Sequence, residues 1–375
     1  MSELSYMDKL LDGVEVEWID VKDLCGVITT GKLNANAMED NGVYPFFTCN
    51  QHPYKINSYA FDMEAILISG NGSQVGHLNY YNGKFNAYQR TYVVGGFKDN
   101  VKVMYFFYYL KHTLKNYIIK NSRKGSVPYI TMPMLENFKI PIPPLNVQAE
   151  IVRILDTFTE LTAELTAELT ARQQQYEYYR EQLLTSFNDD ETEIKTLKDI
   201  FIMKAGQYIS ASKISANKSI SHIYPCFGGN GIRGFVDEKS HDGSYLLIGR
   251  QGALCGNVHR MSGEFYATEH AVVVTAKDGI NIDWAFHKLT LMNLNQYASK
   301  SAQPGLAVGK LAGLKVSVPS LDEQERIAAI LDKFEAITAS LTEGLPREIE
   351  LRQQQYEYYR DLLLSFPKPE VVAHD

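Results

Sequence analysis

The sequence predicts two α/β (α+β) globular modules in tandem, joined by two long antiparallel coiled-coil helices and related by an internal pseudo-two-fold repeat. Three observations predict this fold: a nine-residue segment that occurs twice, an alternation of basic and acidic blocks, and two long amphipathic stretches. A chain of 375 residues, 45% hydrophobic and 22% charged, is long enough for two domains with separate cores. This composition excludes a disordered, collagen-like or disulfide-stapled protein.

The clearest sign of duplication is residues 172–180, which recur unchanged as residues 352–360, at an offset of 180. The same offset relates scattered positions before this segment, and an offset of 176 relates the stretches that enter the helices. Residues 6–11 resemble residues 179–184, as if the repeat were cyclic. Matched positions include Tyr44 and Tyr224, Gly72 and Gly252, Gly76 and Gly256, Phe85 and Phe265, Gln148 and Gln324, and Asp156 and Asp332.

The acidic stretch that follows the first module predicts one long amphipathic helix over residues 147–187. At 100° per residue its apolar side chains fall within an arc of about 120°, and at ~1.5 Å per residue it is roughly 60 Å long. The second acidic stretch carries an equivalent stripe, so the two helices can bury each other. Gly344 and Pro346 lie inside that stripe without shifting its phase, which predicts one kinked helix.

The two basic blocks predict compact mixed α/β modules. Short runs rich in Val, Ile, Tyr and Phe at residues 65–69, 88–94, 245–248 and 271–275 predict strands, and Gly, Asn and Asp clusters separate them. One helix-like stretch occurs in each block, near residues 101–120 and 281–299.

The charge changes sign from block to block along the chain. We expect five regions: an N-terminal segment that completes the cyclic repeat (1–17), module 1 (18–143), a central helical region (144–193), module 2 (194–319) and a C-terminal helical region (320–375). Their net charges are −4, +5, −8, +6 and −6. Two basic modules between acidic connectors are typical of a protein with two surfaces for a polyanion.

Catalytic motifs are missing from the sequence. Residues 229–234 fit the glycine pattern of a dinucleotide site but are not followed by a helix signal, and residues 305–310 fall short of a phosphate-binding loop. Four scattered cysteines and nine histidines show no metal-ligand spacing, so we expect neither a metal site nor catalytic residues. The N-terminus lacks the features of a signal peptide, and we expect a cytoplasmic protein.

Alternating modules and helices, the Thr-Ala-Glu-Leu run at residues 162–165 and again at 166–169, and the segment at 349–361 together resemble the specificity (S) subunit of type I restriction-modification enzymes. The resemblance covers the whole chain, and the helical segments are its specific part. It implies that the modules are target-recognition domains, each reading one half of a bipartite, asymmetric site in double-stranded DNA. It also implies that the helices set the spacer and dock the partner subunits.

By the same resemblance, the partners are two adenine-N6 methyltransferase subunits and two ATP-dependent translocase/nuclease subunits. S-adenosylmethionine, ATP and Mg are then expected in those partners, with no cofactor in this chain. The chain itself would be a non-catalytic subunit of the complex.

The repeated Thr-Ala-Glu-Leu run has a geometric consequence. Adding or removing one such run changes the helix by ~6 Å and ~40°, which keeps the apolar stripe nearly in phase. Since DNA rises about 3.4 Å per base pair, half-site spacing would change by one to two base pairs.

Side chains that can make two hydrogen bonds to a base, in Gly/Asn-rich loops, are our candidates for reading bases. Basic side chains near them are candidates for phosphate contacts. In module 1 these DNA-binding candidates are Asn50, Asn71, Gln74, Gln89, Arg90, Lys120, Arg123 and Lys124. In module 2 they are Asn230, Arg233, Arg250, Gln251, Asn257, His270, Lys300 and Gln303. The exposed helix positions Glu160, Glu164, Glu168 and Tyr178 are candidates for the partner interface.

Three other functions remain open at this point. The chain could be a stand-alone, two-headed DNA-binding regulator, a structural scaffold whose modules bind protein, or a catalytic subunit with an unrecognised site. Adjacent methyltransferase and translocase genes would distinguish the specificity subunit from all three.

Overall fold

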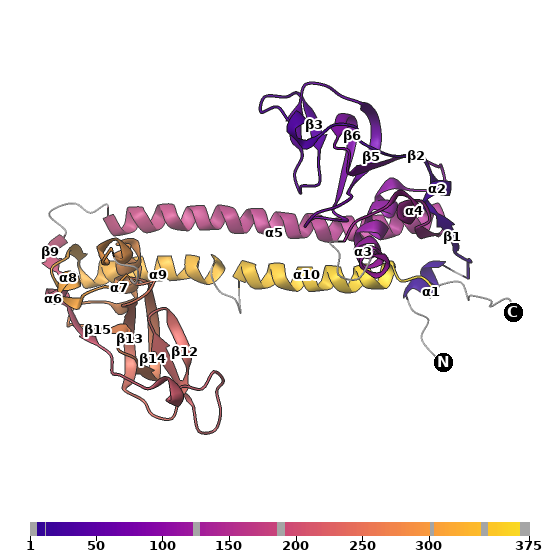
Figure 1. Cartoon of the computed structure of the whole chain (residues 1–375). Helices are drawn as coiled ribbons and strands as arrows, with labels where there is room; N and C mark the ends of the chain where they lie inside the picture. Colours follow the sequence, from indigo (N-terminus) through magenta and orange to yellow (C-terminus); the bar gives the residue numbers. More distant parts are fainter. Residues whose placement is uncertain are drawn as a thin grey trace. The chain divides into compact units, whose positions relative to one another are not determined.

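The protein divides into two compact units in the computed structural model, which describes residues 6–11, 13–122, 128–185, 192–300, 304–338 and 344–367. Unit 1 comprises residues 1–164 and 349–375, and unit 2 comprises residues 165–348. Each unit contains one module together with parts of the long helices (Figure 1).

The module of unit 1 is built on a six-stranded sheet with the order β2-β7-β5-β6-β3-β4. Neighbouring strands are antiparallel except β3 and β6, which are parallel. The strands are β2 (Cys25–Thr30), β3 (Tyr44–Phe47), β4 (Tyr54–Ile56), β5 (Phe61–Ser69), β6 (Leu78–Ala87) and β7 (Thr91–Phe97).

The C-terminal half of strand β5 is buried on both faces because two separate cores lie on either side of it. Ile66 and Ile68 belong to the larger core, which includes the helix α3 (Val103–Asn121). Ala65 and Leu67 point the other way, into a smaller core around Phe85. Side chains alternate between the faces of a strand, so a stretch covered on both sides, here residues 65–68, is apolar at every position.

The module of unit 2 repeats this sheet with the order β10-β15-β13-β14-β11-β12, and β11 and β14 are its parallel pair. Helix α7 (Ile282–Leu291) takes the place of α3. The repetition of the mixed sheet confirms the predicted fold class of two tandem α/β modules. The strands are β10 (Phe201–Ala205), β11 (Tyr224–Gly228), β12 (Gly231–Val236), β13 (His241–Gly249), β14 (Val258–Ala267) and β15 (Ala271–Ala276).

Each unit also contains a two-stranded antiparallel sheet, whose second strand directly precedes a long helix in the chain. It pairs β1 (Glu17–Asp20) with β8 (Lys139–Ile142) in unit 1, and β9 (Thr192–Thr196) with β16 (Lys315–Pro319) in unit 2. The short helices of the chain are α1 (Tyr6–Leu11), α2 (Val21–Leu24), α4 (Met132–Glu136), α6 (Leu197–Ile200), α8 (Val308–Ala312), η1 (Ala35–Ala37), η3 (Ala211–Lys213) and η4 (Leu294–Tyr297).

The first long helix, α5 (Leu145–Thr185), is continuous over 41 residues and close to its predicted extent; residues 186 and 187 lie outside the described residues. The second is not the single kinked helix that we predicted but two helices, α9 (Leu321–Thr338) and α10 (Gly344–Leu363). Gly344 opens α10 with a φ of +79°, and Pro346 lies in its first turn, where proline is tolerated.

Each unit contains the same aromatic contact along the long helices. In unit 1, Phe158 of α5 stacks on Tyr359 of α10, with ring centroids 5.3 Å apart. In unit 2, Tyr179 of α5 stacks on Phe334 of α9 at 5.6 Å. The sequence offsets relate these two pairs, so the duplication extends to the packing of the helices.

Some predicted elements have different limits in the structure. Residues 65–69, 245–248 and 271–275 lie inside longer strands, but β7 starts only at Thr91 because residues 88–90 form a turn. The helix predicted near 281–299 ends at Leu291, since Asn293 adopts a left-handed conformation with a φ of 44°. Residues 229 and 230 form the turn between β11 and β12, and residues 231–234 belong to β12, so this glycine pattern does not lead into a helix as a dinucleotide site requires.

Among the described residues, every helix is too short or too polar to span a lipid bilayer.

A buried glutamine near the start of each long helix connects it to the module. Gln148 is fully buried, accepts a hydrogen bond from the Lys102 N–H, and donates to the carbonyl groups of Asn100 and Pro143 at 2.9 and 2.8 Å. Gln324 makes the equivalent three bonds in unit 2, with the Asn281 N–H and the carbonyl groups of Gly279 and Pro319. A buried carboxamide that satisfies three backbone groups fixes where the helix starts relative to its module.

We expect Gln148→Ala to destabilise unit 1 by about 2–4 kcal/mol, because it leaves one donor and two acceptors without partners in a buried place. Hydrogen exchange should become faster in the first turns of α5 and near Lys102, with unit 2 unaffected. Gln324→Ala is the matched variant and should give the converse pattern. Unchanged exchange in both variants would contradict this role.

Candidate nucleic-acid interface

Three loops of module 1 meet at one place: the β3–β4 turn (48–53), the β5–β6 loop (70–77) and the β6–β7 turn (88–90). The Cys49 thiol lies 3.3 Å from the Asn71 side-chain oxygen and 3.3 Å from the Arg90 carbonyl, so it contacts the other two loops. The His77 ring nitrogen Nε2 lies 3.2 Å from the Gln51 carbonyl. The sheet therefore brings together loops that are 41 residues apart in the sequence, as Cys49 and Arg90 are.

The five base-reading candidates of module 1 all lie on these loops. Asn71, Gln89 and Arg90 line one surface hollow of about 260 Å³, and Asn50 lines a neighbouring hollow of about 390 Å³. Gln74 is exposed on the same loop as Asn71. The structure thus brings together residues that the sequence only suggested one by one, although their contact with bases stays a prediction.

The predicted phosphate contacts of module 1 are only partly described. Lys120 is exposed in the last turn of α3, whose Ile118 lies near Gly76 of the β5–β6 loop. Arg123 and Lys124 lie outside the described residues.

Module 2 gathers its candidates in the equivalent loops. The Asn257 side chain donates to the Asn230 side-chain oxygen at 3.2 Å, and the Arg250 guanidinium donates to the Glu269 carbonyl at 3.2 Å. His270 and Glu269 form the β14–β15 turn, with Nε2 of the histidine 3.2 Å from the carboxylate.

Three further candidates of module 2 lie in or beside these loops, and a fourth is not described. Gln251 bridges to Gly305, which places the segment bearing the exposed Lys300 beside the β13–β14 loop. Arg233 is exposed on β12, next to Gly228 at the end of β11. Gln303 lies outside the described residues.

Repeated glycines shape the β5–β6 and β13–β14 loops. Gly76 and Gly256 have φ values of +80° and +95°, which favour glycine. A Cβ on Gly256 would also lie only 2.4 Å from the backbone nitrogen of Asn295, so the loop packs closely on the segment after α7. The loop backbone is held in the same way in both modules while its polar side chains differ.

The candidates for the partner interface lie on exposed positions of α5. Glu160, Glu164 and Glu168 are exposed at four-residue spacing, and Glu168 pairs with Arg172 at 3.2 Å. Tyr178 is 61% exposed and makes an edge contact with Tyr179. Their accessibility fits a docking role, which stays a prediction.

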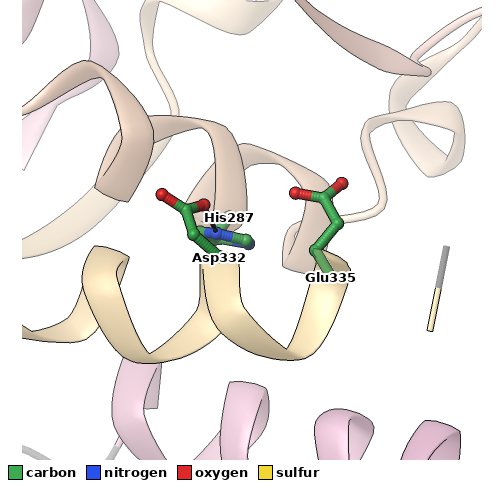
Figure 2. Close-up of side chains that lie close together, drawn as sticks. All are labelled: His287, Asp332 and Glu335. Carbon is green, nitrogen blue, oxygen red and sulfur yellow. Dashed lines mark hydrogen bonds and ion pairs between the residues drawn. The ribbon is translucent and has the colours of Figure 1, made fainter. Parts of the chain in front are cut away.

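Sequence reasoning missed a polar cluster in unit 2 that joins the module to the helices. Figure 2 shows Asp332 and Glu335 on α9, with the fully buried His287 of α7 beside Asp332. His287 Nε2 lies 2.8 Å from the Asp332 carboxylate, and the Arg260 guanidinium of β14 lies 2.5 Å from the same oxygen and 3.4 Å from Glu335. Tyr176 of α5 completes the cluster, its hydroxyl 3.3 Å from His287 Nδ1.

His287, Asp332 and Glu335 have the side chains of a cation site, but Arg260 supplies the positive charge there. Its guanidinium also lies over the Phe286 ring, 4.1 Å from the centroid. Burial lowers the pKa of His287, and the nearby Arg260 acts in the same direction against the opposing effect of Asp332. Burial raises the pKa of Glu335. We therefore interpret the cluster as a structural joint.

Unit 1 has a simpler version of this joint. The Tyr108 hydroxyl donates to the Asp156 carboxylate at 2.5 Å, and burial raises the pKa of Tyr108. Asp156 and Asp332 are matched positions of the repeat, which was the only sequence signal for the joint. Their partners differ between the units, so the rest of the cluster had no signature.

Comparison with known proteins identifies the family. The type I restriction modification DNA specificity domain matches the chain twice, over residues 13–172 and 189–351. The EcoprrI specificity subunit of Escherichia coli is 50% identical over 382 residues, covering 92% of this chain and 93% of that one. The EcoR124I/EcoR124II specificity subunit of Escherichia coli is 34% identical over 413 residues and covers both chains completely.

Solved structures show the same fold. The crystal structure of a type I restriction-modification S subunit from M. genitalium has a TM-score of 0.62 at 16% identity, covering 95% of this chain and 97% of that one. A chain from a study of type I complex assembly and conformational transition has a TM-score of 0.57 at 13% identity, covering 94% and 98%.

The chain belongs to the type I restriction-modification DNA specificity family. This finding confirms the predicted function, the DNA-specificity subunit of a type I system, and its place as the non-catalytic member of such an enzyme.

We expect unit 2 to lose stability as the pH falls below about 6.5, in part because of His287. Its pKa is lower in the folded protein than in the unfolded chain, so the unfolded chain binds the proton more readily and acid favours unfolding. The contribution should be complete above that pH. In His287→Gln, the unfolding free energy of unit 2 should depend less steeply on pH between 7 and 5.5.

His52→Gln, which changes an exposed histidine of unit 1, is the control and should keep the wild-type slope. An unchanged slope in His287→Gln would show that this side chain does not titrate differently on folding.

Proposed function

We propose that each module reads one half of a bipartite, asymmetric site in double-stranded DNA. The observation that carries this proposal is the gathering of the same three loops in both modules, on one scaffold but with different polar side chains. An identical pair of modules would favour a symmetric site, whereas unlike side chains on a shared backbone favour two different half-sites. The net charges of +5 and +6 on the modules support a polyanionic ligand.

In this proposal, the acidic helical regions bind the protein partners. The central region carries a net charge of −8, which DNA would repel, and its exposed glutamates leave it available to a protein. Two adenine-N6 methyltransferase subunits would dock on the helices, and two ATP-dependent translocase/nuclease subunits would join them. S-adenosylmethionine, ATP and Mg would be bound by those partners, and the complex would work in the cytoplasm.

The exposed part of the nine-residue repeat supports two copies of one partner. Tyr178 is 61% exposed, and Tyr358, its equivalent in the second copy, is 65% exposed. Packing between the helices explains why Tyr179 and Tyr359 are repeated, but it does not explain the repetition of exposed tyrosines. The same surface presented twice would bind the same subunit twice.

The direct test is to co-express the chain with its neighbouring methyltransferase subunit and to map adenine methylation across the genome of the host. We expect a split, bipartite methylated motif that appears only with this chain. Tight, site-specific DNA binding by the chain alone, with no methylation motif, would favour the two-headed regulator instead.

We expect deletion of residues 166–169 to shorten the spacer of the methylated motif by one to two base pairs and to leave both half-sites unchanged. The deletion shortens α5 by about 6 Å and rotates the remainder of the helix by about 40°, which keeps the apolar stripe nearly in phase. Methylation mapping reads the spacer directly. The control Thr166→Ala alters the same run at constant length and should keep the wild-type spacer; an unchanged spacer in the deletion variant would exclude the helix as the ruler.

We expect the double variant Tyr178→Ala/Tyr358→Ala to bind methyltransferase subunits at least 30-fold more weakly, since an interface aromatic typically contributes about 2 kcal/mol. Each single variant should retain one subunit, which native mass spectrometry would show as a one-to-one complex. Tyr208→Ala, at a tyrosine of module 2 that is 77% exposed, is the matched control. Full two-subunit assembly in the double variant would place the interface elsewhere.

A further inference from the structure

The turns that join β6 to β7 and β14 to β15 have the same backbone hydrogen bonds in both modules. The N–H of the first turn residue donates to a strand carbonyl, in β3 for module 1 and in β11 for module 2. The carbonyl of the last turn residue accepts from an N–H of the β5–β6 loop in module 1 and of the β13–β14 loop in module 2. The pairs are Tyr88 to Phe47 and Thr268 to Phe227, then Gly70 to Arg90 and Arg250 to His270, with lengths of 2.8 to 2.9 Å.

Each turn is also closed in the same way and covered by a glycine. The Thr91 N–H donates to the Tyr88 carbonyl, and the Ala271 N–H donates to the Thr268 carbonyl. Gly206 lies so close to the turn of module 2 that a Cβ there would be 2.3 Å from the Thr268 carbonyl oxygen. These contacts hold the turns rigidly, so a change of side chain at the tip changes chemistry without changing the backbone.

The two-residue tips carry different hydrogen-bonding chemistry. Module 1 has Gln89 and Arg90, which suit bidentate bonds to adenine and guanine, respectively. Module 2 has Glu269 and His270 at the same positions. A carboxylate only accepts hydrogen bonds, and in the major groove it suits the exocyclic amino group of a base, above all that of cytosine.

Glu269 is an unexpected residue for a surface that faces phosphates. It lies beside two basic side chains: Arg250 donates to its backbone carbonyl, and the His270 ring is 3.2 Å from its carboxylate.

The carboxylate of Glu269 also has an unused acceptor. Within the described residues, its Oε2 has no hydrogen-bond partner, and neither has Nδ1 of His270, although both atoms are shielded from solvent. A shielded carboxylate oxygen without a donor is costly, and a donor that reached it would stabilise it. The Glu269 side chain as a whole is 32% exposed, so a change of its rotamer would bring this oxygen to the surface, where the amino group of a base is such a donor.

We propose that Glu269 determines the specificity of module 2 by accepting a hydrogen bond from the exocyclic amino group of a base, and that Gln89 holds the equivalent position in module 1. This inference rests on the proposed reading of half-sites by the two modules. According to this inference, the same turn in each module reads one position of its half-site. In module 2 its side chain, Glu269, only accepts hydrogen bonds, and in module 1 its side chain, Gln89, both donates and accepts.

The test is methylation mapping with the full-length chain and its methyltransferase subunit, comparing wild type with Glu269→Gln. We expect the preference to change at one position of one half-site, with a loss of about 10- to 100-fold for the original base pair there. The spacer and the other half-site should not change. Glu264→Gln, which removes the same charge from an exposed residue of β14 that pairs with Lys239, is the matched control and should keep the wild-type motif.

The reciprocal variant Gln89→Glu provides a second, independent readout, because its effect should be confined to the other half-site. An unchanged motif in both variants would overturn the inference, as would an equal loss across all sequences with the complex still assembled. If wild type itself produces no bipartite motif, the proposed function fails; a wild-type motif that neither variant alters refutes only the assignment of the turn.

Discussion

The carboxamide of one buried glutamine in each unit fixes where the long helix starts relative to its module, and the packing further along that helix depends on this start. Gln148 and Gln324 satisfy three backbone groups each, at the point where the chain leaves the module and enters the helix. A backbone donor that is shielded from water must find a partner, so the helix has one favourable starting position. The aromatic stacking of Phe158 and of Phe334 lies further along helices whose starts are fixed in this way.

Much of this architecture could be predicted from the sequence because the chain contains it twice. The repeat of residues 172–180, the matched glutamines and the 3.6-residue periodicity of α5 depend on packing that leaves regular traces in sequence. The break between α9 and α10 left no such trace, since the apolar stripe keeps its phase through Gly344. The end of α7 was also missed, because the left-handed conformation of Asn293 is a property of one residue rather than of a pattern.

The candidate site was predictable as a set of residues but not as a surface. Polar forks in glycine-rich loops suggested Asn50, Asn71 and Arg90, yet only the parallel pairing of β3 with β6 explains why these loops meet. Long-range pairing is encoded by contacts that are far apart in the chain, and local patterns do not report it. The joint around Arg260 and His287 was invisible for a different reason: its five residues are spread over four elements, and unit 1 uses other side chains for the same purpose.

The residues packed in the two cores on either side of β5 and β13 are under different evolutionary constraints from the exposed side chains of the loops. The smaller core lies on the other face of the sheet from α3, and it includes Phe47, Ala87 and Val93. The larger core contains α3 and the entry to the long helices, where Ile151 and Leu155 pack. Exposed polar side chains of the loops can therefore change while the packed residues of both cores stay the same. A lineage can explore new loop chemistry in one module at a time while its other module and its assembly stay intact, which makes the duplicated fold unusually open to evolutionary change.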